Sequence, residues 1–359
     1  MSRIDPLPIH GFLGGKCFAS HHPPSGPVRS TAYVICPPLG YEAMQSYHAM
    51  KVLAERLSTQ GIHVLRLDYH GTGESLGSDA DPGRVAAWLD SVRLGVQALR
   101  QLKCVRQVGL VGVRMGATLA VRAASNVAVE ELVLWAPCPS GATYVRELEI
   151  LASASLAALV ERDSSRGSAS RAEPEGLTAG GYLLTWETVK DLRHVAIKDD
   201  PLPSAPDVLL IERDDQPPVE GLAEHFSSRG CRTTTERMAG FKEMMVAPAE
   251  SRVPHWVFSR ITDWVLDRSE MVGRPIDNQA LLEHEVEEGT VRHLAVRFGP
   301  SRELFGVLTE PVPPSPPNRA PVLFLAGGAV PRTAVNRMYV TCARRLARAG
   351  HPALRIDVS

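Results

Sequence analysis

Short apolar runs alternate with longer amphipathic segments over the first two fifths of the chain. Each apolar run is of strand length, and each amphipathic segment has helical periodicity. The order strand, helix, strand predicts a parallel sheet with right-handed crossovers. The predicted elements are strands over 32–36, 62–67, 108–111 and 132–135, and helices over 50–60, 84–102 and 117–124.

The regular alternation is interrupted after Pro139. Helical stretches over 144–160 and 185–192 flank a polar, small-residue run at 163–170, which predicts a lid inserted at about 139–200. A strand at 208–211 and a closing helix at 254–266 complete the unit. The pattern therefore predicts one α/β domain, residues 1–268, with a helical lid insertion.

The remaining residues, 269–359, contain an internal repeat. The run 346–357 (LARAGHPALRID) echoes 57–68 (LSTQGIHVLRLD), and a Pro-rich turn precedes an apolar strand in both halves. Strand-like segments over 286–308 begin this second copy, which reaches Ser359 without an elbow or an acid of its own. We hypothesise a linker and a truncated second α/β unit, with an unpaired sheet edge.

The sequence Gly112-Val113-Arg114-Met115-Gly116 has the frame of a nucleophile elbow, G-x-S-x-G, with arginine in place of serine. It follows a predicted buried strand and opens a predicted helix, as that turn requires. Gly112 and Gly116 would let the strand and helix pack closely. A guanidinium cannot attack an acyl carbon, so the frame predicts the fold without the usual chemistry.

Composition and charge restrict the function further. The chain has 359 residues and a formal net charge of −1, which disfavours nucleic-acid or polybasic membrane binding. Six scattered cysteines lack zinc-ligand spacing, so we expect no metal, no cofactor and reduced thiols. No apolar run approaches the ~20 residues that span a bilayer. We expect a cytoplasmic protein whose partner is a small acyl or anionic molecule, and leave the oligomeric state open.

Two further segments complete a family resemblance: 36–42 (CPPLGYE) and 65–75 (LRLDYHGTGES). Together with the elbow frame, they resemble the serine aminopeptidase-like branch of the α/β-hydrolase superfamily, near the hydrolase-like proteins associated with exosortase systems. The resemblance covers residues 10–268 and, weakly, the second copy. It implies an α/β-hydrolase fold and a hydrolase acting on an ester, thioester or amide of a small acid.

The resemblance also assigns roles to positions of this chain. Leu39 and Met115 would supply the two oxyanion-hole N–H groups, and Asp214 or Asp215 would be the triad acid. The triad histidine would lie in 238–249, which contains none, and His255 follows inside the predicted closing helix. Since both serine and histidine are missing, serine-type hydrolysis at this elbow is disfavoured.

Three other residues are weaker candidates for a nucleophile. Ser75 satisfies G-x-S-x-G in 73–77 but is not followed directly by a helix, so a loop serine at the rim of the site is the favoured interpretation. Cys138 and Ser140 follow a strand at the sheet edge where ligands bind, but no histidine stands beside the thiol to activate it. For Cys138 we favour a small buried residue under the lid.

Arg114 leaves two hypotheses open. A left-handed non-glycine residue costs roughly 1–2 kcal/mol, which suggests that the position is held for a reason. With the Leu39 and Met115 N–H groups, the guanidinium could hold a carboxylate, phosphate or acyl-carrier phosphopantetheine group. Alternatively, it pairs with Asp214, Asp215 or a lid glutamate and closes the pocket. The protein is then a degenerate hydrolase, a non-catalytic binding module, or the scaffold half of a two-copy hydrolase.

Overall fold

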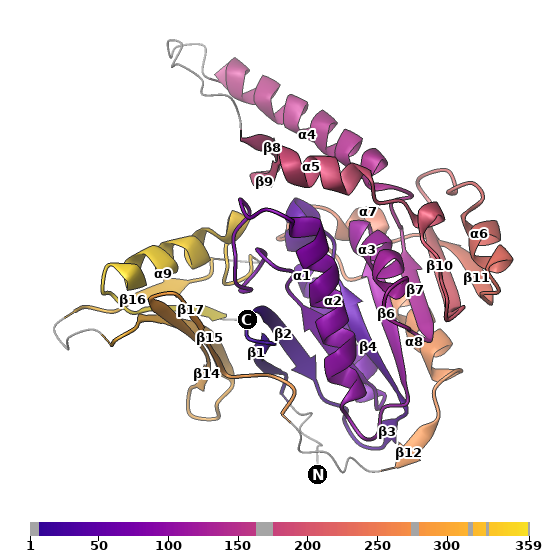
Figure 1. The fold of residues 1–359 in the computed structure, drawn as a ribbon, viewed down its shortest axis with the longest axis horizontal. Coiled ribbons are helices and arrows are strands. Elements are labelled where there is room, and N and C mark those ends of the chain that lie inside the picture. Colours follow the sequence, from indigo (N-terminus) through magenta and orange to yellow (C-terminus); the bar gives the residue numbers. More distant parts are fainter. Residues whose placement is uncertain (1–6, 163–174, 274–279, 315–318, 328–329, 358–359) are drawn as a thin grey trace.

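The computed structural model describes residues 7–162, 175–273, 280–314, 319–327 and 330–357, with side chains of 155–162 excepted. Its main sheet has eight strands in the order β1-β2-β5-β4-β6-β7-β10-β11 (Figure 1). The strands from β5 to β11 are parallel, and β1 and β2 add an antiparallel hairpin at one edge. The predicted parallel sheet is confirmed. The strands are β1 Ile9–Leu13, β2 Cys17–His22, β4 Thr31–Cys36, β5 His63–Leu67, β6 Gln107–Val113, β7 Glu131–Trp135, β10 Asp207–Arg213 and β11 Thr233–Met238.

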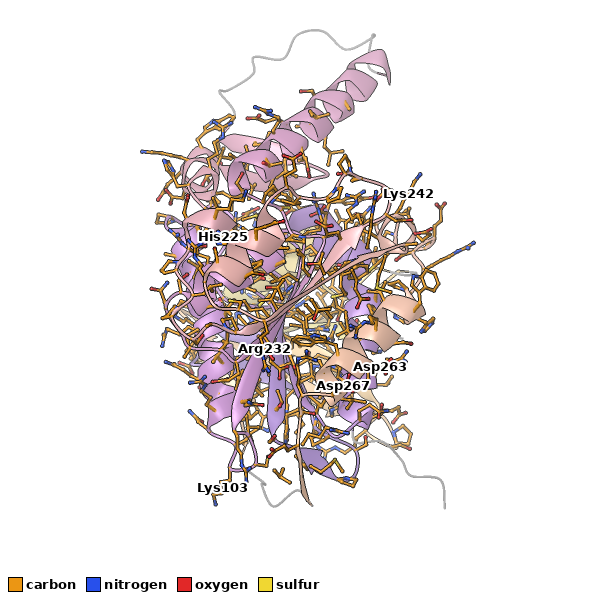
Figure 2. All side chains as sticks on the ribbon, turned by 90° about the vertical axis from the view of Figure 1, so that its right-hand side faces the viewer. Lys103, His225, Arg232, Lys242, Asp263 and Asp267 are labelled. Carbon is orange, nitrogen blue, oxygen red and sulfur yellow. The ribbon has the colours of Figure 1, made fainter. Side chains whose placement is uncertain are left out.

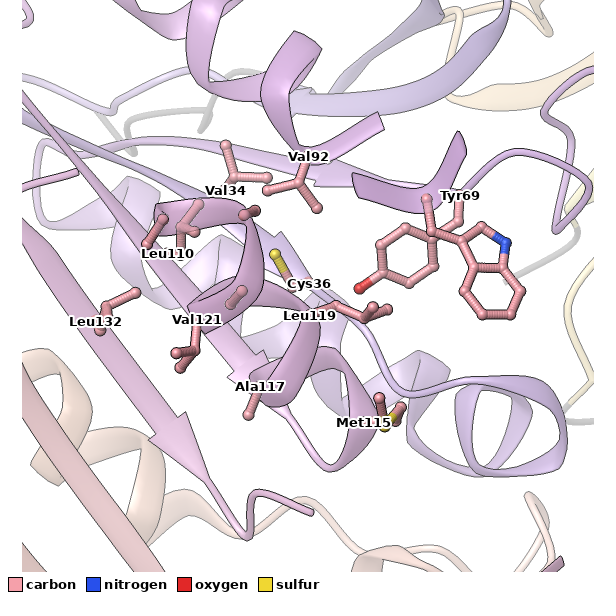
Figure 3. Packing of buried hydrophobic residues seen from close by; sticks show 14 of the residues in the cluster. Val34, Cys36, Tyr69, Val92, Leu110, Met115, Ala117, Leu119, Val121 and Leu132 are labelled. Carbon is pink, nitrogen blue, oxygen red and sulfur yellow. The ribbon is translucent and has the colours of Figure 1, made fainter. Parts of the chain in front are cut away.

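Helices cover both faces of this sheet. One face packs on α2, α3 and α6, and the other packs on α1, α7 and α8. Figure 3 shows the first of these cores, where Val34 and Cys36 of β4 meet Val92 of α2 and Leu119 of α3. The helices are α1 Gly40–Thr59, α2 Arg84–Arg100, α3 Met115–Ala124, α6 Leu222–Ser228, α7 Phe241–Met244 and α8 His255–Leu266.

Helix α1 begins ten residues before the predicted start at Met50. Gly40 opens it with a positive φ of 57°, and two polar residues of its first turns, Gln45 and Ser46, are buried. The apolar periodicity of this half is consequently weak, which is why the sequence pattern locates only the second half. The early start brings Glu42 close to the elbow.

An insertion between β7 and β10, which we call the lid segment, lies over the carboxyl edge of the sheet (Figure 1). It contains α4 Gly141–Arg162, the hairpin β8 Gly176–Ala179 and β9 Tyr182–Thr185, α5 Trp186–Arg193 and a short 3-10 turn, Ile197–Asp199. Both predicted helices are present, while the hairpin was not predicted. The polar run 163–170 lies outside the described residues.

The C-terminal part forms a second, five-stranded sheet, which lies beside β1 and β2 (Figure 1). Its order is β13-β14-β15-β17-β16, with the last pair parallel and joined through α9. The two sheets are linked by an isolated bridge between Phe12 and Glu283. The elements are β13 Glu285–Glu288, β14 Val291–Phe298, β15 Leu304–Pro311, β16 Val322–Leu325, the 3-10 turn Val335–Arg337, α9 Met338–Arg348 and β17 Ala353–Asp357. A separate two-stranded sheet is formed by β3 Val28–Arg29 and β12 Met271–Gly273.

The opposite edge of the main sheet is formed by β11 and carries charged side chains. Figure 2 shows this side, with Arg232, Asp263 and Asp267 on its surface. Arg232 forms a two-pronged ion pair with Asp207 at 2.6–2.7 Å. Among the described residues, no helix is long and apolar enough to cross a membrane.

The buried turn that follows β5 joins the two parts of the protein. The Glu74 carboxylate is 2% exposed and contacts Arg355 of β17 at 2.8 Å and Arg332 at 3.2 Å. Arg337 and Arg344 donate to carbonyl oxygens of the same turn, those of Ser75 and Gly77 among them. We call this set the arginine cluster: Arg332, Arg337, Arg344 and Arg355. Backbone and carboxylate acceptors of one turn thus hold the C-terminal part in place.

The close approach of α3 to β4 permits only glycine at position 116. A Cβ placed there would lie 2.2 Å from the Pro37 carbonyl oxygen and 2.3 Å from that of Cys36, and both atoms belong to the backbone. We expect Gly116→Ala to lower the free energy of unfolding by about 3 kcal/mol, because overpacked contacts with backbone cannot relax by side-chain rotation. Urea denaturation measures the loss. The matched change Gly327→Ala, where none of the described atoms lies within 4 Å of the added Cβ, should cost less than about 1 kcal/mol, and equal costs would contradict the packing argument.

Candidate functional site

The elbow has the backbone that the sequence frame predicts. Arg114 lies between β6 and α3 with φ 54° and ψ −126°, a conformation that costs a non-glycine residue about 1–3 kcal/mol. Its amide donates to the Trp135 carbonyl at 3.0 Å, and its carbonyl accepts from Ala117 at 3.0 Å. A Cβ at Gly112 would lie 2.4 Å from the Ala117 Cα. The tight strand-to-helix turn is therefore built around arginine.

Two carboxylates neutralise the Arg114 guanidinium. Its Nε donates to the Glu42 Oε1 at 2.8 Å, and its Nη2 pairs with Glu147 of the lid helix α4. Burial disfavours the charged form, but the nearby carboxylates outweigh burial and raise the pKa of Arg114, so it remains a cation. Of the two hypotheses for Arg114, this geometry matches pairing with a lid glutamate. Sequence reasoning did not name Glu42, because the first half of α1 was not predicted.

Phe241 lies where the resemblance would place the triad histidine. It opens α7 directly after β11 and is 3% exposed. The Arg213 guanidinium lies 4.1 Å from the centre of its ring, and the Arg114 guanidinium lies 5.9 Å away. Cations near an aromatic face are attracted by its quadrupole. The residue at the elbow is therefore in contact with an aromatic ring that also binds Arg213, and an acid–histidine pair does not occupy this place.

In the described part of the chain, no hydrogen bond or ion pair joins either acid candidate, Asp214 or Asp215, to Arg114. Asp215 forms a two-pronged ion pair at 2.7–2.8 Å with Arg213, which lies two residues before it in the chain. The hydrogen bonds from Arg213 lower the pKa of Asp215 and outweigh burial, which acts in the opposite direction. Asp214 is exposed and offers its backbone carbonyl to Arg237 at 2.8 Å. Both residues follow β10, as predicted from the sequence.

The oxyanion candidates lie at the starts of two helices. Leu39 is the residue before α1, and Met115 is the first residue of α3; both are buried. Helix N-termini carry unpaired N–H groups and positive potential, so these positions suit an anionic oxygen. Leu39 and Met115 thus lie at helix starts, where the resemblance implies oxyanion-hole N–H groups, and Arg114 directly precedes Met115.

The three alternative nucleophile candidates have other tasks. Ser75 is fully buried, not at the rim: its hydroxyl donates to the Asp68 carbonyl at 2.6 Å and accepts from the Phe18 amide at 2.8 Å. Burial raises the pKa of the Cys138 thiol, which keeps it protonated at neutral pH. The Ser140 hydroxyl accepts from the Thr143 amide at 3.2 Å and caps α4. The rim position expected for Ser75 is corrected, because the turn folds inward to meet β2.

Over the described part of the chain, no group of three or more His, Cys, Asp or Glu side chains is placed to hold a metal ion. His255, the histidine nearest to the expected triad position in sequence, is the first residue of α8 and is exposed.

The fold agrees with comparisons with known proteins. Residues 41–179 match the serine aminopeptidase, S33, family. The structure of Est1E from Butyrivibrio proteoclasticus with bound ferulic acid aligns with a TM-score of 0.53 and 18% identity, over 72% of this chain and 98% of that one. Proline iminopeptidase from Mycobacterium smegmatis aligns with a TM-score of 0.50 and 12% identity, over 72% and 98%. None of the curated proteins matches this sequence.

The chain has an α/β-hydrolase fold with a second β-rich unit at its C-terminal end, and residues 41–179 resemble the serine aminopeptidase family. At these identities the structural likeness shows the fold alone. The residues at the elbow therefore decide what can be said of its chemistry.

The Arg114 ion pairs differ in exposure, and we expect them to contribute unequally to stability. The Arg114 side chain is 9% exposed, while that of Glu147 is 45% exposed. We expect Arg114→Ala to cost about 2–3 kcal/mol of unfolding free energy, because it leaves the Glu42 carboxylate without its cation. Glu147→Gln should cost less than about 1 kcal/mol, as for an exposed pair. Thermal and urea unfolding of both variants measure the difference, and a Glu147→Gln cost equal to that of Arg114→Ala would contradict this assignment.

Proposed function

We propose that this protein is a non-catalytic α/β-hydrolase-fold protein that binds a small molecule instead of hydrolysing it. The observation that carries the proposal is the buried Arg114 at the nucleophile position, ion-paired to Glu42 and Glu147. A hydroxyl or thiol nucleophile is missing at the elbow, and Phe241 stands in the place expected for the general base. By its superfamily the ligand class is a small acid or its acyl derivative.

The test is labelling of the whole chain with a fluorophosphonate probe, together with turnover of p-nitrophenyl acetate. We expect no labelling of the wild type and no turnover above background. Stoichiometric labelling would overturn the proposal, and Ser75 and Ser140 would be mapped first. An Arg114→Ser variant is the matched comparison: labelling gained by it would show that the Leu39 and Met115 amides still form a usable oxyanion site.

A second candidate function is that of scaffold for another hydrolase-fold unit, and one observation favours it. The strand–helix–strand unit β16-α9-β17 repeats the arrangement of β4-α1-β5. In the second unit Leu323 pairs with Leu354, at the positions where Val34 pairs with Leu65 in the first. Val34 is buried under α2, whereas Leu323 and Leu325 are 55% and 56% exposed. The apolar face that helices cover in the first unit is open in the second, and a further strand and helix would fit it.

The oligomeric state tests this candidate. If the open face accepts a second copy of the chain, light scattering should give a mass above that of the monomer, and Leu323→Lys with Leu325→Lys should return the monomer. A wild type that stays monomeric at high concentration, with no change in the double variant, would remove the support for a self-association role.

We also propose a cytoplasmic location, supported by six cysteines that are all free. Cell fractionation with an antibody against the native chain tests it, and recovery from an oxidising compartment would overturn it.

A further inference from the structure

A cavity of about 150 Å³ lies beside the elbow, between the main domain and the C-terminal part. Its wall includes the loop before α1, the turn after β5, the start of α2, the lid hairpin β9 and residues 331–337. Arg114, Glu42 and Glu147 do not line it, so it is separate from the ion-paired elbow. Apolar side chains form most of the wall, among them Phe18, Leu39, Met44 and Trp88.

The charged groups at this cavity are unbalanced. Four arginines and two aspartates line it: Arg66, Arg84, Arg332, Arg337, Asp68 and Asp79. Arg332 is already neutralised by Asp357 at 2.7 Å and Glu74 at 3.2 Å. Within the described ranges, no carboxylate lies within 4.0 Å of the Arg84 or Arg337 guanidinium, although Asp79 acts on both at longer range.

Arg84 is nearly fully buried at the start of α2, with 4% of its surface exposed. Its Nη1 donates to the carbonyl oxygens of Asp79 and Leu183 at 3.1 and 3.2 Å. Its Nε has no hydrogen-bond partner in the described part of the chain. The guanidinium lies 5.0 Å from the centre of the Trp88 ring. A buried cation with an unused N–H donor is costly unless an anion completes its shell.

Arg337 reaches the cavity from the C-terminal part. It donates to three carbonyl oxygens of the turn after β5, those of Gly73, Ser75 and Gly77, at 2.6–3.0 Å. Carbonyl oxygens satisfy its N–H groups but leave its full charge uncompensated. Burial, together with the neighbouring Arg344, lowers the pKa of Arg337 to about 9. A bound anion would stabilise the charged form.

Asp68, the buried acid in this wall, does not cancel that excess. One of its carboxylate oxygens accepts from the Glu74 amide at 2.9 Å. Burial raises the pKa of Asp68, and this acid is one carboxylate among four lining arginines.

We propose that this cavity binds a small carboxylic acid with an apolar body, its carboxylate held by Arg84 and Arg337 and its body enclosed by Phe18, Met44 and Trp88. A cavity of this size holds a group about as large as benzene. An arginine pairs with a carboxylate through parallel N–H donors, which favours an acid over its amide or ester. This proposal rests on the proposed binding function and adds the class of ligand that is bound.

Residues of the C-terminal part complete the site. Pro331, Arg332, Thr333, Ala334 and Asn336 line the cavity together with Arg337, and the arginine cluster fixes this segment to the turn after β5. Neither part of the protein forms the cavity alone. The C-terminal part therefore acts as one wall of the binding site.

The experiment is isothermal titration of the whole chain with phenylacetate, and with phenylacetamide as the neutral analogue. We expect saturable binding of phenylacetate and at least tenfold weaker binding of the amide. Arg84→Gln should weaken phenylacetate binding at least tenfold, while Arg84→Lys keeps part of it. Arg93→Gln, on an exposed turn of the same helix, is the matched control and should bind as the wild type does.

Ala43→Leu provides a second, uncharged test, because it fills the cavity from α1 and should also abolish binding. No saturable binding of phenylacetate at millimolar concentration would overturn the site, and equal affinity for the amide would overturn its charge selectivity. Either result leaves the inactive elbow untouched. Fluorophosphonate labelling would instead overturn the non-catalytic function and leave a measured phenylacetate site in place.

Discussion

Glu74→Gln is expected to lower the free energy of unfolding by about 3–5 kcal/mol, the cost of removing one partner from a buried ion pair. Glu74 lies between Arg355, which is fully buried, and Arg332, which is 4% exposed. Burial alone would raise the pKa of Glu74, but these two arginines hold it at about 2. Glutamine keeps the shape of the side chain and removes its charge, so Arg355 would remain buried without a counter-ion.

Urea unfolding at neutral pH measures this loss. Glu149→Gln is the matched control, because Glu149 pairs with Arg193 where both side chains are more than 40% exposed. That change should cost less than about 1 kcal/mol. A Glu74→Gln variant within 1 kcal/mol of the wild type would show that the arginine cluster does not depend on Glu74.

Mild acid is expected to destabilise the protein strongly, because β2 carries two buried histidines. Burial, and then the neighbouring His63, lowers the pKa of His21 to about 3; burial, and then Arg66, lowers that of His22 to about 2. In the unfolded chain both residues take up a proton near pH 6.5, while the folded protein keeps them neutral. Stability is thus complete above about pH 6.5 and falls as the pH decreases towards these folded pKa values.

Each histidine contributes a slope of roughly 1.4 kcal/mol per pH unit, so the two together cost roughly 5 kcal/mol between pH 6.5 and pH 4.5. Below about pH 4.5 the free energy of unfolding falls further, because the pKa of Glu74 is lowered in the folded protein and protonation removes its ion pairs. Urea midpoints at pH 7.5, 6.0 and 5.0 measure the slope. His21→Gln should flatten it and His48→Gln, at an exposed position of α1, should not; equal slopes for wild type and His21→Gln would refute the assignment.

The sequence pattern was sufficient for the parallel sheet, because its buried strands read as continuous apolar runs such as 108–111 and 132–135. It was also sufficient for the elbow, whose glycines are fixed by backbone contacts. The lid hairpin was missed, because β8 and β9 are only four residues each. Short elements of this kind are held by tertiary contacts that no local pattern records.

The site was only partly predictable for a related reason. Arg114 stands out because a motif defines its position, whereas Glu42, Glu147 and Phe241 come from three separate elements and reach it only in the fold. The same holds for Glu74 and the arginine cluster, which are more than 250 residues apart in the chain. Charge complementarity between distant segments leaves no spacing signal in a single sequence.

The surroundings of Arg114 restrict what a single substitution at the elbow can achieve. A single change back to serine would leave two carboxylates, Glu42 and Glu147, facing one another without their cation, and Phe241 where a base must stand. A serine at position 114 would therefore need matching changes at Glu42, Glu147 and Phe241 before the surroundings suited a neutral hydroxyl. Three elements that are distant in sequence thus fix the identity of one turn residue.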